Sequence, residues 1–304
     1  MITAGHVAGT AGRICAGVAA AGGAVAAWSL LVEPHWFALR QATLPVLPPG
    51  SSPRRLLHIS DLHLVPGQAP KRRWVSRLAR LDPDLVVTTG DNIGSARALP
   101  DLFECLEPLL ERPGAFVFGS NDYYAPVVKN PLGYLSGPSN RGRPRHGALL
   151  PVEDLRSGLR RAGWLDLNNA TGALSLGGLR VSLAGMDDPH IGRHRWPHPD
   201  WAPAGDAEAL QLGVVHAPYR AVLDRFARAG ADLVLAGHTH GGQVRIPFWG
   251  APATNCDLGR DQARGVMPWG RAVVNVSAGV GCAPMAPVRF ACRPEASLLT
   301  LVAR

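Results

Sequence analysis

Short apolar runs, each followed by polar residues of the kinds that bind metals, most constrain what this chain can fold into. From Arg54 onward, runs of four to six residues rich in Val, Leu and Ile alternate with longer amphipathic stretches. Runs of that length are too short for helices and are typical of buried strands that alternate with helices. The sequence therefore predicts an α/β fold. The runs concerned are 56–60, 85–89, 115–118, 212–215 and 233–236.

Each of these predicted strands ends in a polar segment. In open α/β sheets, ligands bind beyond the carboxyl ends of the strands. The strand ends are therefore expected to bring carboxylate, amide and imidazole groups to one edge of the fold. The segments are Asp61-Leu62-His63, Gly90-Asp91-Asn92, Gly119-Ser120-Asn121-Asp122, His216-Ala217-Pro218 and Gly237-His238-Thr239-His240.

This combination of ligands predicts a site for two metal ions. Imidazole and carboxylate together suit zinc, iron, manganese or nickel, and the candidates outnumber the ligands of one tetrahedral ion. In extended backbone, residues i and i+2 point to one side, so Asp61 with His63, and His238 with His240, can each reach a common centre. Asp91 is the best candidate for a bridging carboxylate. Such sites hold ions about 3.5–4 Å apart and acidify a bridging water into a nucleophile.

The five segments, in this order, resemble the calcineurin-like metallophosphoesterases, whose pattern is DxH, GD, a GNH-type strand end, a single His and GHxH. The resemblance spans about residues 55–245. The extended run from Gly237 to Gln243, which reads GHTHGGQ, resembles a membrane-associated bacterial subgroup that includes relatives of lipid A precursor pyrophosphatases. Residues 185–188 and 287–290 are similar to further hallmarks of that subgroup.

The resemblance implies a β-sandwich of two mixed sheets flanked by helices, and two divalent ions, Mn²⁺, Fe²⁺/³⁺ or Zn²⁺. It implies a metal-dependent hydrolase that cleaves a phosphodiester, pyrophosphate or phosphomonoester bond on a phosphorylated small molecule or lipid. The membrane segment described below favours a lipid-linked or membrane-proximal substrate. Asp91, Asn121 and Asp122 are the expected catalytic residues. The expected metal ligands are Asp61, His63 and His240 for one ion, Asp91 as the bridge, and Asn121, His216 and His238 for the other.

One strand end departs from the family pattern. Where family members have Gly-Asn-His-Asp, this chain has Gly119-Ser120-Asn121-Asp122. Either Asn121 becomes the metal ligand, or Ser120 takes the ligand place and Asn121 replaces the histidine. Asn121 is favoured as the ligand, because an amide oxygen is a better neutral donor than a hydroxyl. In both cases the histidine that protonates the leaving group is missing, and that help is worth about 10²- to 10⁴-fold.

The N-terminus predicts a membrane segment. Residues 14–32 form a nineteen-residue stretch without charge, which matches the minimum length for spanning a bilayer core. We expect residues 1–33 to be a single anchor in the cell membrane, with a signal peptide cleaved on export as the alternative. Residues 34–53, which contain five prolines, are expected to form an extended linker, and residues 54–304 the phosphoesterase domain. Deleting residues 1–50 is then expected to leave an active domain.

Charge and composition leave other functions open. The formal net charge of +8 suits anionic partners, but no nucleic-acid module is visible and aromatic residues are only 6%. A nuclease is therefore the weaker enzyme hypothesis, and a metal- and phosphate-binding sensor or scaffold with little turnover is the second class. The basic segment 129–161 is a candidate substrate lid, and the loop with His190, His194 and His198 is a candidate source of phosphate donors or a replacement acid.

Overall fold

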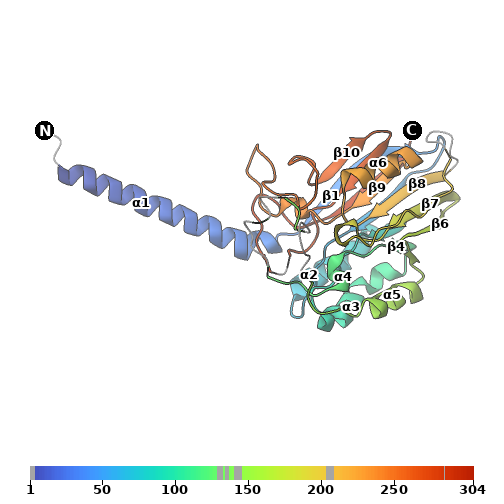
Figure 1. The fold of residues 1–304 in the computed structure, drawn as a ribbon, viewed down its shortest axis with the longest axis horizontal. Coiled ribbons are helices and arrows are strands. Elements are labelled where there is room, and N and C mark those ends of the chain that lie inside the picture. The colour runs from blue at the N-terminus through green and yellow to red at the C-terminus, as the bar shows by residue number, and fades with distance from the viewer. Residues whose placement is uncertain (1–3, 129–132, 134–136, 140–145, 203–208, 284) are drawn as a thin grey trace.

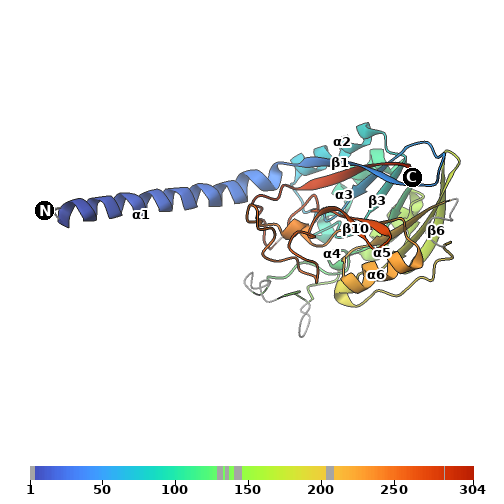
Figure 2. The same ribbon diagram turned by 90° about the horizontal axis from the view of Figure 1, so that it is seen from above.

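The computed structural model describes residues 4–128, 133, 137–139, 146–202, 209–283 and 285–304. Two six-stranded sheets lie face to face, helices cover their outer surfaces, and one long helix projects from the domain (Figure 1). Figure 2 shows the same layers from above. The predicted α/β fold of two mixed sheets flanked by helices is confirmed.

The first sheet has the strand order β1-β12-β2-β3-β4-β5. Only the β12–β2 pair is antiparallel, so this sheet is mixed. The strands β2, β3 and β4 are parallel neighbours, so their carboxyl ends meet at one edge. The bounds are β1 Ala38–Leu47, β2 Arg54–Ile59, β3 Leu85–Thr88, β4 Gly114–Phe116, β5 Leu165–Asp166 and β12 Glu295–Ala303.

The second sheet has the strand order β10-β11-β9-β8-β7-β6 and is also mixed. Its outer pairs, β10–β11 and β6–β7, are antiparallel, and its inner pairs are parallel. The polar strand ends therefore come from two sheets: three from the first, and those of β8 and β9 from the second. The bounds are β6 Ala170–Leu176, β7 Leu179–Met186, β8 Ala209–Val215, β9 Leu233–Ala236, β10 Gly265–Trp269 and β11 Ala272–Val276.

Apolar side chains hold the layers together. Leu56 and Val87 of the first sheet belong to the same buried cluster as Leu212 and Leu235 of the second. The helices α2, α3 and α5 pack on the outer face of the first sheet, and α6 packs on the second, with Phe226 buried beneath it. Helix bounds are α1 Ala4–Ala27, α2 Ala69–Arg77, α3 Leu99–Leu110, α4 Ser120–Tyr123, α5 Val152–Arg161 and α6 Arg220–Ala229. The short turns are η1 Trp28–Val32, η2 Glu33–His35, η3 Leu78–Leu81, η4 Ala96–Ala98, η6 Pro189–Ile191 and η7 His240–Gly242.

The segment expected to be a linker is extended, but half of it belongs to the sheet. Residues 38–47 form β1, an edge strand that pairs in parallel with β12. Leu44, Val46 and Leu47 are buried in the core between the sheets. Pro45 is tolerated in this strand because an edge strand leaves some N–H groups unpaired. The proline pattern therefore marks an edge strand here, and deletion of residues 1–50 would remove part of the fold.

Among the described residues, one stretch of helix, Ala16–His35, is long and apolar enough to cross a membrane. It projects from the domain, and most of its side chains are exposed (Figures 1 and 2). A signal sequence near the N-terminus would meet the same criteria of length and composition.

Candidate metal centre

The residues at the strand ends have an unusual backbone. Asp61, His63, Asp91, His238 and His240 all have positive φ, between 41° and 69°. Non-glycine residues rarely adopt this region, and doing so costs about 1–3 kcal/mol each. Such strain persists only where the surroundings fix the chain. It clusters here at the strand ends that carry the candidate ligands.

Backbone hydrogen bonds between the loops fix these turns. The Asp61 N–H donates to the Gly90 carbonyl at 2.9 Å, and the His63 N–H donates to the Asp91 carbonyl at 2.9 Å. Across the two sheets, the His238 N–H donates to both Asp61 carboxylate oxygens at 3.0 and 3.1 Å. The loops therefore hold the side chains in one cluster although they come from different strands.

The described residues contain two buried groups with the composition of metal sites. One is Asp61, His63 and His240, and the other is Asp61, Asp91 and His216. The Nε2 atoms of His63 and His240 are 3.0 Å apart. Asp91 Oδ2 lies 3.4 Å from His63 Nε2 and 3.5 Å from His216 Nε2. Asp61 is thus common to both groups. Asp91 contacts His63 of the first group and His216 of the second.

Three histidines place an Nε2 atom in this cluster, which is what a metal ligand requires. His216 Nδ1–H donates to the Thr89 carbonyl at 2.6 Å, and its Nε2 faces Asp91 Oδ2 at 3.5 Å. Within the described part of the chain, His216 Nε2, His63 Nδ1 and His240 Nδ1 are buried and have no hydrogen-bond partner. Metal-bound histidines commonly donate their other N–H to a carbonyl or carboxylate. The residues therefore fit a pair of divalent ions.

Burial and charge tune the protonation of the same groups. Burial lowers the pKa of His63 to about 4 and lowers that of His240 well below its usual range. Burial opposes the charged form of Asp91, but His216 and His63 hold the pKa of its carboxyl well below the ordinary value. Burial also opposes the charged form of His216, but Asp91 holds the pKa of this imidazole well above its ordinary value. The neutral imidazoles of His63 and His240 and the ionised Asp91 are the forms that bind cations, and His216 would release its proton on binding one.

Two motif glycines are required because the ligands approach them closely. A Cβ at Gly119 would lie 2.3 Å from Asp91 Oδ1, and one at Gly237 would lie 2.5 Å from Asp61 Oδ2. Contacts under 3 Å would displace the carboxylates. The glycines therefore make room for the carboxylates of Asp91 and Asp61.

Asp122 supports the site and does not face the pocket. It is fully buried, and its carboxylate accepts the backbone N–H groups of Asp91 at 2.8 Å, Asn92 at 2.8 Å and Gly119 at 3.0 Å. Asn92 Nδ2–H adds a longer hydrogen bond of 3.2 Å. Asp122 therefore joins the loop after β3 to the loop after β4 and positions Asp91.

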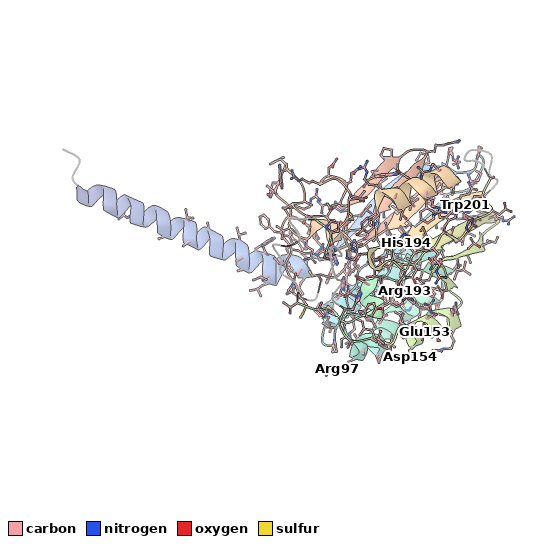
Figure 3. The ribbon with its side chains drawn as sticks, in the orientation of Figure 1. Arg97, Glu153, Asp154, Arg193, His194 and Trp201 are labelled. Atoms are coloured by element: carbon pink, nitrogen blue, oxygen red, sulfur yellow. The ribbon has the colours of Figure 1, made fainter. Side chains whose placement is uncertain are left out.

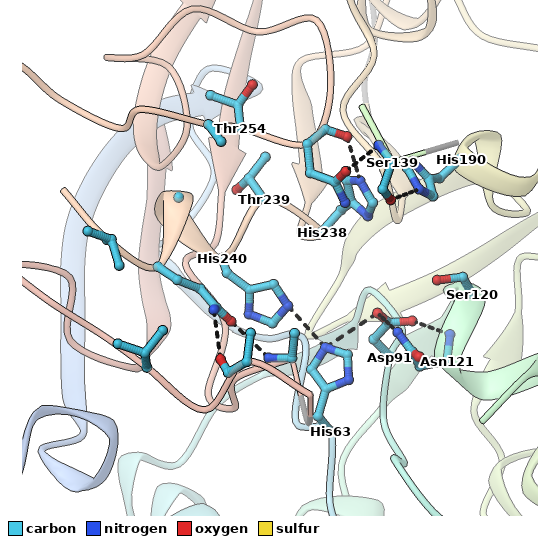
Figure 4. Close-up of a pocket in the computed structure, with 18 of the residues that line it drawn as sticks. His63, Asp91, Ser120, Asn121, Ser139, His190, His238, Thr239, His240 and Thr254 are labelled. Atoms are coloured by element: carbon cyan, nitrogen blue, oxygen red, sulfur yellow. Dashed lines mark hydrogen bonds and ion pairs between the residues drawn. The ribbon is translucent and has the colours of Figure 1, made fainter. Parts of the chain in front are cut away.

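Ser120 and Asn121 both line the pocket beside Asp91 (Figure 4). The Asn121 backbone N–H donates to Asp91 Oδ1 at 2.7 Å, and its Nδ2–H donates to Asp91 Oδ2 at 2.9 Å. Asn121 is therefore the neighbour that binds the Asp91 carboxylate directly, while the Ser120 hydroxyl lies at the pocket surface.

His238 lies at the pocket but belongs to neither of the two groups among the described residues. Its Nε2–H donates to the Asn255 carbonyl at 3.0 Å. Its ring centroid lies 4.4 Å from that of His190 and 5.2 Å from that of His216. His190 in turn contacts Tyr219 Oη at 3.0 Å and Ser139 Oγ at 3.1 Å.

A cavity of about 390 Å³ opens over the cluster. His63, Asp91 and His240 form part of its polar lining, and His190 and Ser139 lie on the side of His238 (Figure 4). Six further residues of the lining are apolar, and we call them the apolar wall. Sequence reasoning missed this wall, because its residues follow none of the predicted strand ends and only Val288 lies within a recognised motif, 287–290. Its apolar members are Val244, Pro252, Ala253, Ala283, Ala286 and Val288.

The basic segment and the histidine loop are only partly described. Lys129, Arg141, Arg143 and Arg145 lie outside the described residues. The other arginines of that segment lie on α5, where Arg156 and Arg160 form ion pairs with Asp166. None of the three α5 arginines is among the residues that line the cavity, and the same is true of His194 and His198. Of the loop histidines, His190 alone is placed at the cavity.

Comparison with known proteins decides the family. The family model of the calcineurin-like phosphoesterases matches residues 54–242, which is more than half of the chain and includes every candidate ligand. The chain belongs to the calcineurin-like phosphoesterase family. It is a metal-dependent phosphoesterase, as the strand-end motifs predict.

Similar proteins of this family occur in bacteria and animals. The uncharacterized metallophosphoesterase YkuE of Bacillus subtilis is 26% identical over 306 residues, which cover 96% of this chain and 95% of that protein. Phosphodiesterase YaeI of Escherichia coli is 28% identical and covers 89% of this chain and 90% of its own length. The transmembrane protein with metallophosphoesterase domain of Bos taurus is 29% identical over 65% of this chain and 43% of that protein.

Proposed function

We propose that this chain is a membrane-anchored phosphodiesterase with a dinuclear metal site. One observation carries the proposal: two buried ligand groups share Asp61, and three of their members, His63, Asp91 and His240, line a cavity that also has an apolar wall. The similarity to a relative named a phosphodiesterase supports diesters as the substrate class. The apolar wall supports a lipid-linked or membrane-proximal diester or pyrophosphate.

In this proposal, each group of residues has a defined role. Asp61, His63 and His240 would hold one ion, His216 would hold the second, and Asp91 would contact both. Mixed imidazole and carboxylate donors suit Mn²⁺, Fe²⁺/³⁺ or Zn²⁺. When bound, such a pair of ions polarises the phosphoryl oxygens and lowers the pKa of a water molecule held between them. The assignment of Asn121 or Ser120, and of His238, to the second ion belongs to the proposal.

The residues beside Asp91 predict which leaving groups the site accepts. The Asn121 amide cannot deliver a proton as an imidazolium can, so the position after Ser120 gives no acid catalysis. Esters whose leaving group departs as a stable anion need no such proton. We therefore expect activated diesters and pyrophosphates to be hydrolysed faster than alkyl phosphomonoesters.

The test uses the full-length protein in mild detergent with added Mn²⁺. Turnover is measured on bis(p-nitrophenyl) phosphate and on an alkyl phosphomonoester. The double variant Ser120→Asn/Asn121→His restores the pattern of the family, and we expect its monoester turnover to rise by about 10²-fold, the lower limit for general acid catalysis. Ser120→Asn alone is the matched control and should leave the ratio unchanged. A wild-type preference for alkyl monoesters would contradict the argument, and an unchanged ratio in the double variant would show that another residue supplies the proton.

A sensor or scaffold is the second candidate, because the usual acid is absent. The same assay separates the two hypotheses. Retention of two metal ions per chain without measurable turnover on any of these esters would favour the sensor.

The anchor is part of the proposal, and contacts next to the helix support it. The Glu33 carboxylate is buried and accepts the N–H groups of Ala291 at 3.0 Å and Cys292 at 2.5 Å. The chain directly after the helix is thus built into the domain. A cell-membrane protein that resists extraction with alkaline carbonate and keeps its N-terminus is expected. Recovery of a soluble, exported form trimmed ahead of Glu33 would favour the signal peptide.

A further inference from the structure

An exposed apolar loop lies beside the cavity and has no role in the chemistry described above. We name residues 244–249 the tip loop. Phe248 is fully exposed, and Ile246 and Trp249 expose about half of their surface, at 48% and 47%. Leaving such side chains in water forgoes about 1.5–3 kcal/mol each relative to burial. Clustered exposure of this kind marks an interaction surface.

The backbone holds this loop open. The Ile246 N–H donates to the Gly250 carbonyl at 2.9 Å, and the Trp249 N–H donates to the Ile246 carbonyl at 3.0 Å, which closes a tight turn. Phe248 lies at the apex with φ of 65°, a conformation that is unfavourable for an aromatic residue. The turn therefore presents Phe248 to the surroundings.

Backbone hydrogen bonds connect the tip loop to the C-terminal part of the candidate span. The Arg245 N–H donates to the Phe290 carbonyl at 2.8 Å, and the Phe290 N–H donates to the Gln243 carbonyl at 2.9 Å. The neighbouring Arg289 N–H donates to the Ser29 carbonyl at 3.0 Å, and Ser29 lies within the span Ala16–His35. In both ribbon views, the loops of this part of the chain lie at the junction of the long helix and the domain (Figures 1 and 2).

The surroundings of the tip loop have the composition of a membrane interface. The Arg260 guanidinium stacks 3.8 Å from the centre of the Trp249 ring, and the Arg293 guanidinium stacks 4.0 Å from the centre of the Trp36 ring. Trp36 is half-exposed and directly follows the span. Tryptophan concentrates at the headgroup level of bilayers, and arginine there is attracted to lipid phosphates.

We propose that the tip loop is a second membrane contact, which inserts into the headgroup region of the phospholipid bilayer that the helix spans. A bilayer is the occupant that the geometry favours, because the loop is joined to the span by the backbone hydrogen bonds from Ser29 to Arg245. Two contacts fix the orientation of the domain, whereas a single helix would leave it free to rotate.

The contact also defines how a substrate enters, and this second step rests on the proposed function. Val244 belongs to the tip loop and also lines the cavity, together with Ala286 and Val288. Residues 286–290 connect this apolar wall to the Ser29 junction. The apolar part of a lipid diester therefore has a continuous path from the bilayer to the metal cluster.

The first experiment tests the membrane contact without using activity. The full-length protein, with Cys15→Ala and Cys282→Ser to remove competing thiols, carries Phe248→Cys labelled with a polarity-sensitive dye. Glu153→Cys is the matched control, because Glu153 is exposed on α5, on the side of the domain away from α1 (Figure 3). Each protein is reconstituted into phosphatidylcholine–phosphatidylglycerol vesicles that contain a shallow nitroxide-labelled lipid.

We expect the nitroxide lipid to quench the label at position 248 several-fold more strongly than the label at position 153. Equal quenching at the two positions would overturn the proposal. A dye signal that changes with the number of protein molecules per vesicle, without preferential quenching by the nitroxide lipid, would identify a second copy of the chain as the occupant and would also overturn it.

The second experiment tests the entry path. We expect Phe248→Ser/Trp249→Ser to lower hydrolysis of a lipid diester in vesicles by roughly tenfold, the effect of about 1.4 kcal/mol, and to keep turnover of soluble bis(p-nitrophenyl) phosphate. Leu149→Ser, at an exposed apolar residue elsewhere, should change neither rate. Unchanged lipid hydrolysis in the double variant would refute the path. If the wild type hydrolyses neither ester, the proposed function fails, while the quenching result still decides the membrane contact.

Discussion

Replacing Asp122 should show whether this residue supports the metal cluster structurally or takes part directly in ester hydrolysis. Asp122→Ala leaves the buried N–H groups of Asp91, Asn92 and Gly119 without their acceptor. Each unsatisfied donor costs about 1–3 kcal/mol, and water entering the small cavity offsets part of that cost. We therefore expect the free energy of unfolding to fall by about 3–5 kcal/mol. Asp122→Asn keeps one acceptor oxygen and should lose about 1–3 kcal/mol.

The free energy of unfolding is measured by urea unfolding of the full-length protein in mild detergent after chelation. Bound Mn²⁺ is measured on a separate, folded sample to which the metal has been added. Asp101→Ala is the matched control, because Asp101 forms a partly exposed ion pair with Arg72 at 2.8 Å. Such a surface pair contributes about 0–1 kcal/mol. If Asp122→Ala were no more destabilising than the control while turnover disappeared, Asp122 would act in the chemistry and the positioning argument would be refuted.

Three further predictions concern metal, pH and the edge strand. Asp91→Ala should lower bound metal below one ion per chain and abolish turnover, as measured by elemental analysis and ester hydrolysis; two retained ions would contradict the dinuclear assignment. Burial lowers the pKa of His58 from 6.5 to about 3, so its neutral form is favoured in the fold. The contribution of neutral His58 to the free energy of unfolding should be complete above pH 6.5 and fall by up to about 1.4 kcal/mol per pH unit below it. The difference in unfolding free energy between His58→Gln and the wild type should therefore change between pH 7.5 and pH 5. A constant difference would exclude this role. Deleting residues 1–27 should preserve the fold, whereas deleting 1–50 removes three buried aliphatic side chains of β1, worth about 5–9 kcal/mol together; equal thermal stability of the two truncated proteins would contradict the importance of β1.

The strand-end motifs could be predicted from the sequence because their signal is local. A short apolar run followed by Asp61-Leu62-His63 or Gly90-Asp91 determines both a buried strand and the polar group at its end. Parallel pairing of β2 with β3, and of β8 with β9, then brings those ends together. The chemical type of the site follows from these patterns, and the two mixed sheets are implied by the family that the motifs resemble.

The tertiary structure decided how the ligands are shared and what surrounds them. The sharing of Asp61 by both groups, and the direction of His238 toward Asn255, depend on loops from two different sheets. Ligand identity is fixed by single residues, but ligand geometry is fixed by contacts between loops that lie far apart in the sequence.

The same distinction explains the N-terminal segment and the apolar wall. A strand that pairs with β12, more than 250 residues away, leaves only an extended, proline-containing pattern in the sequence, which is also the pattern of a linker. The wall and the tip loop form because Gln243 and Arg245 exchange backbone hydrogen bonds with Phe290 and because the Arg289 N–H donates to the Ser29 carbonyl. The sequence by itself determined the strands, the ligand types and the apolar helix, since each depends on neighbouring residues. Only the packed chain decided that the helix, the tip loop and the metal cluster lie together, because that arrangement depends on hydrogen bonds between distant segments.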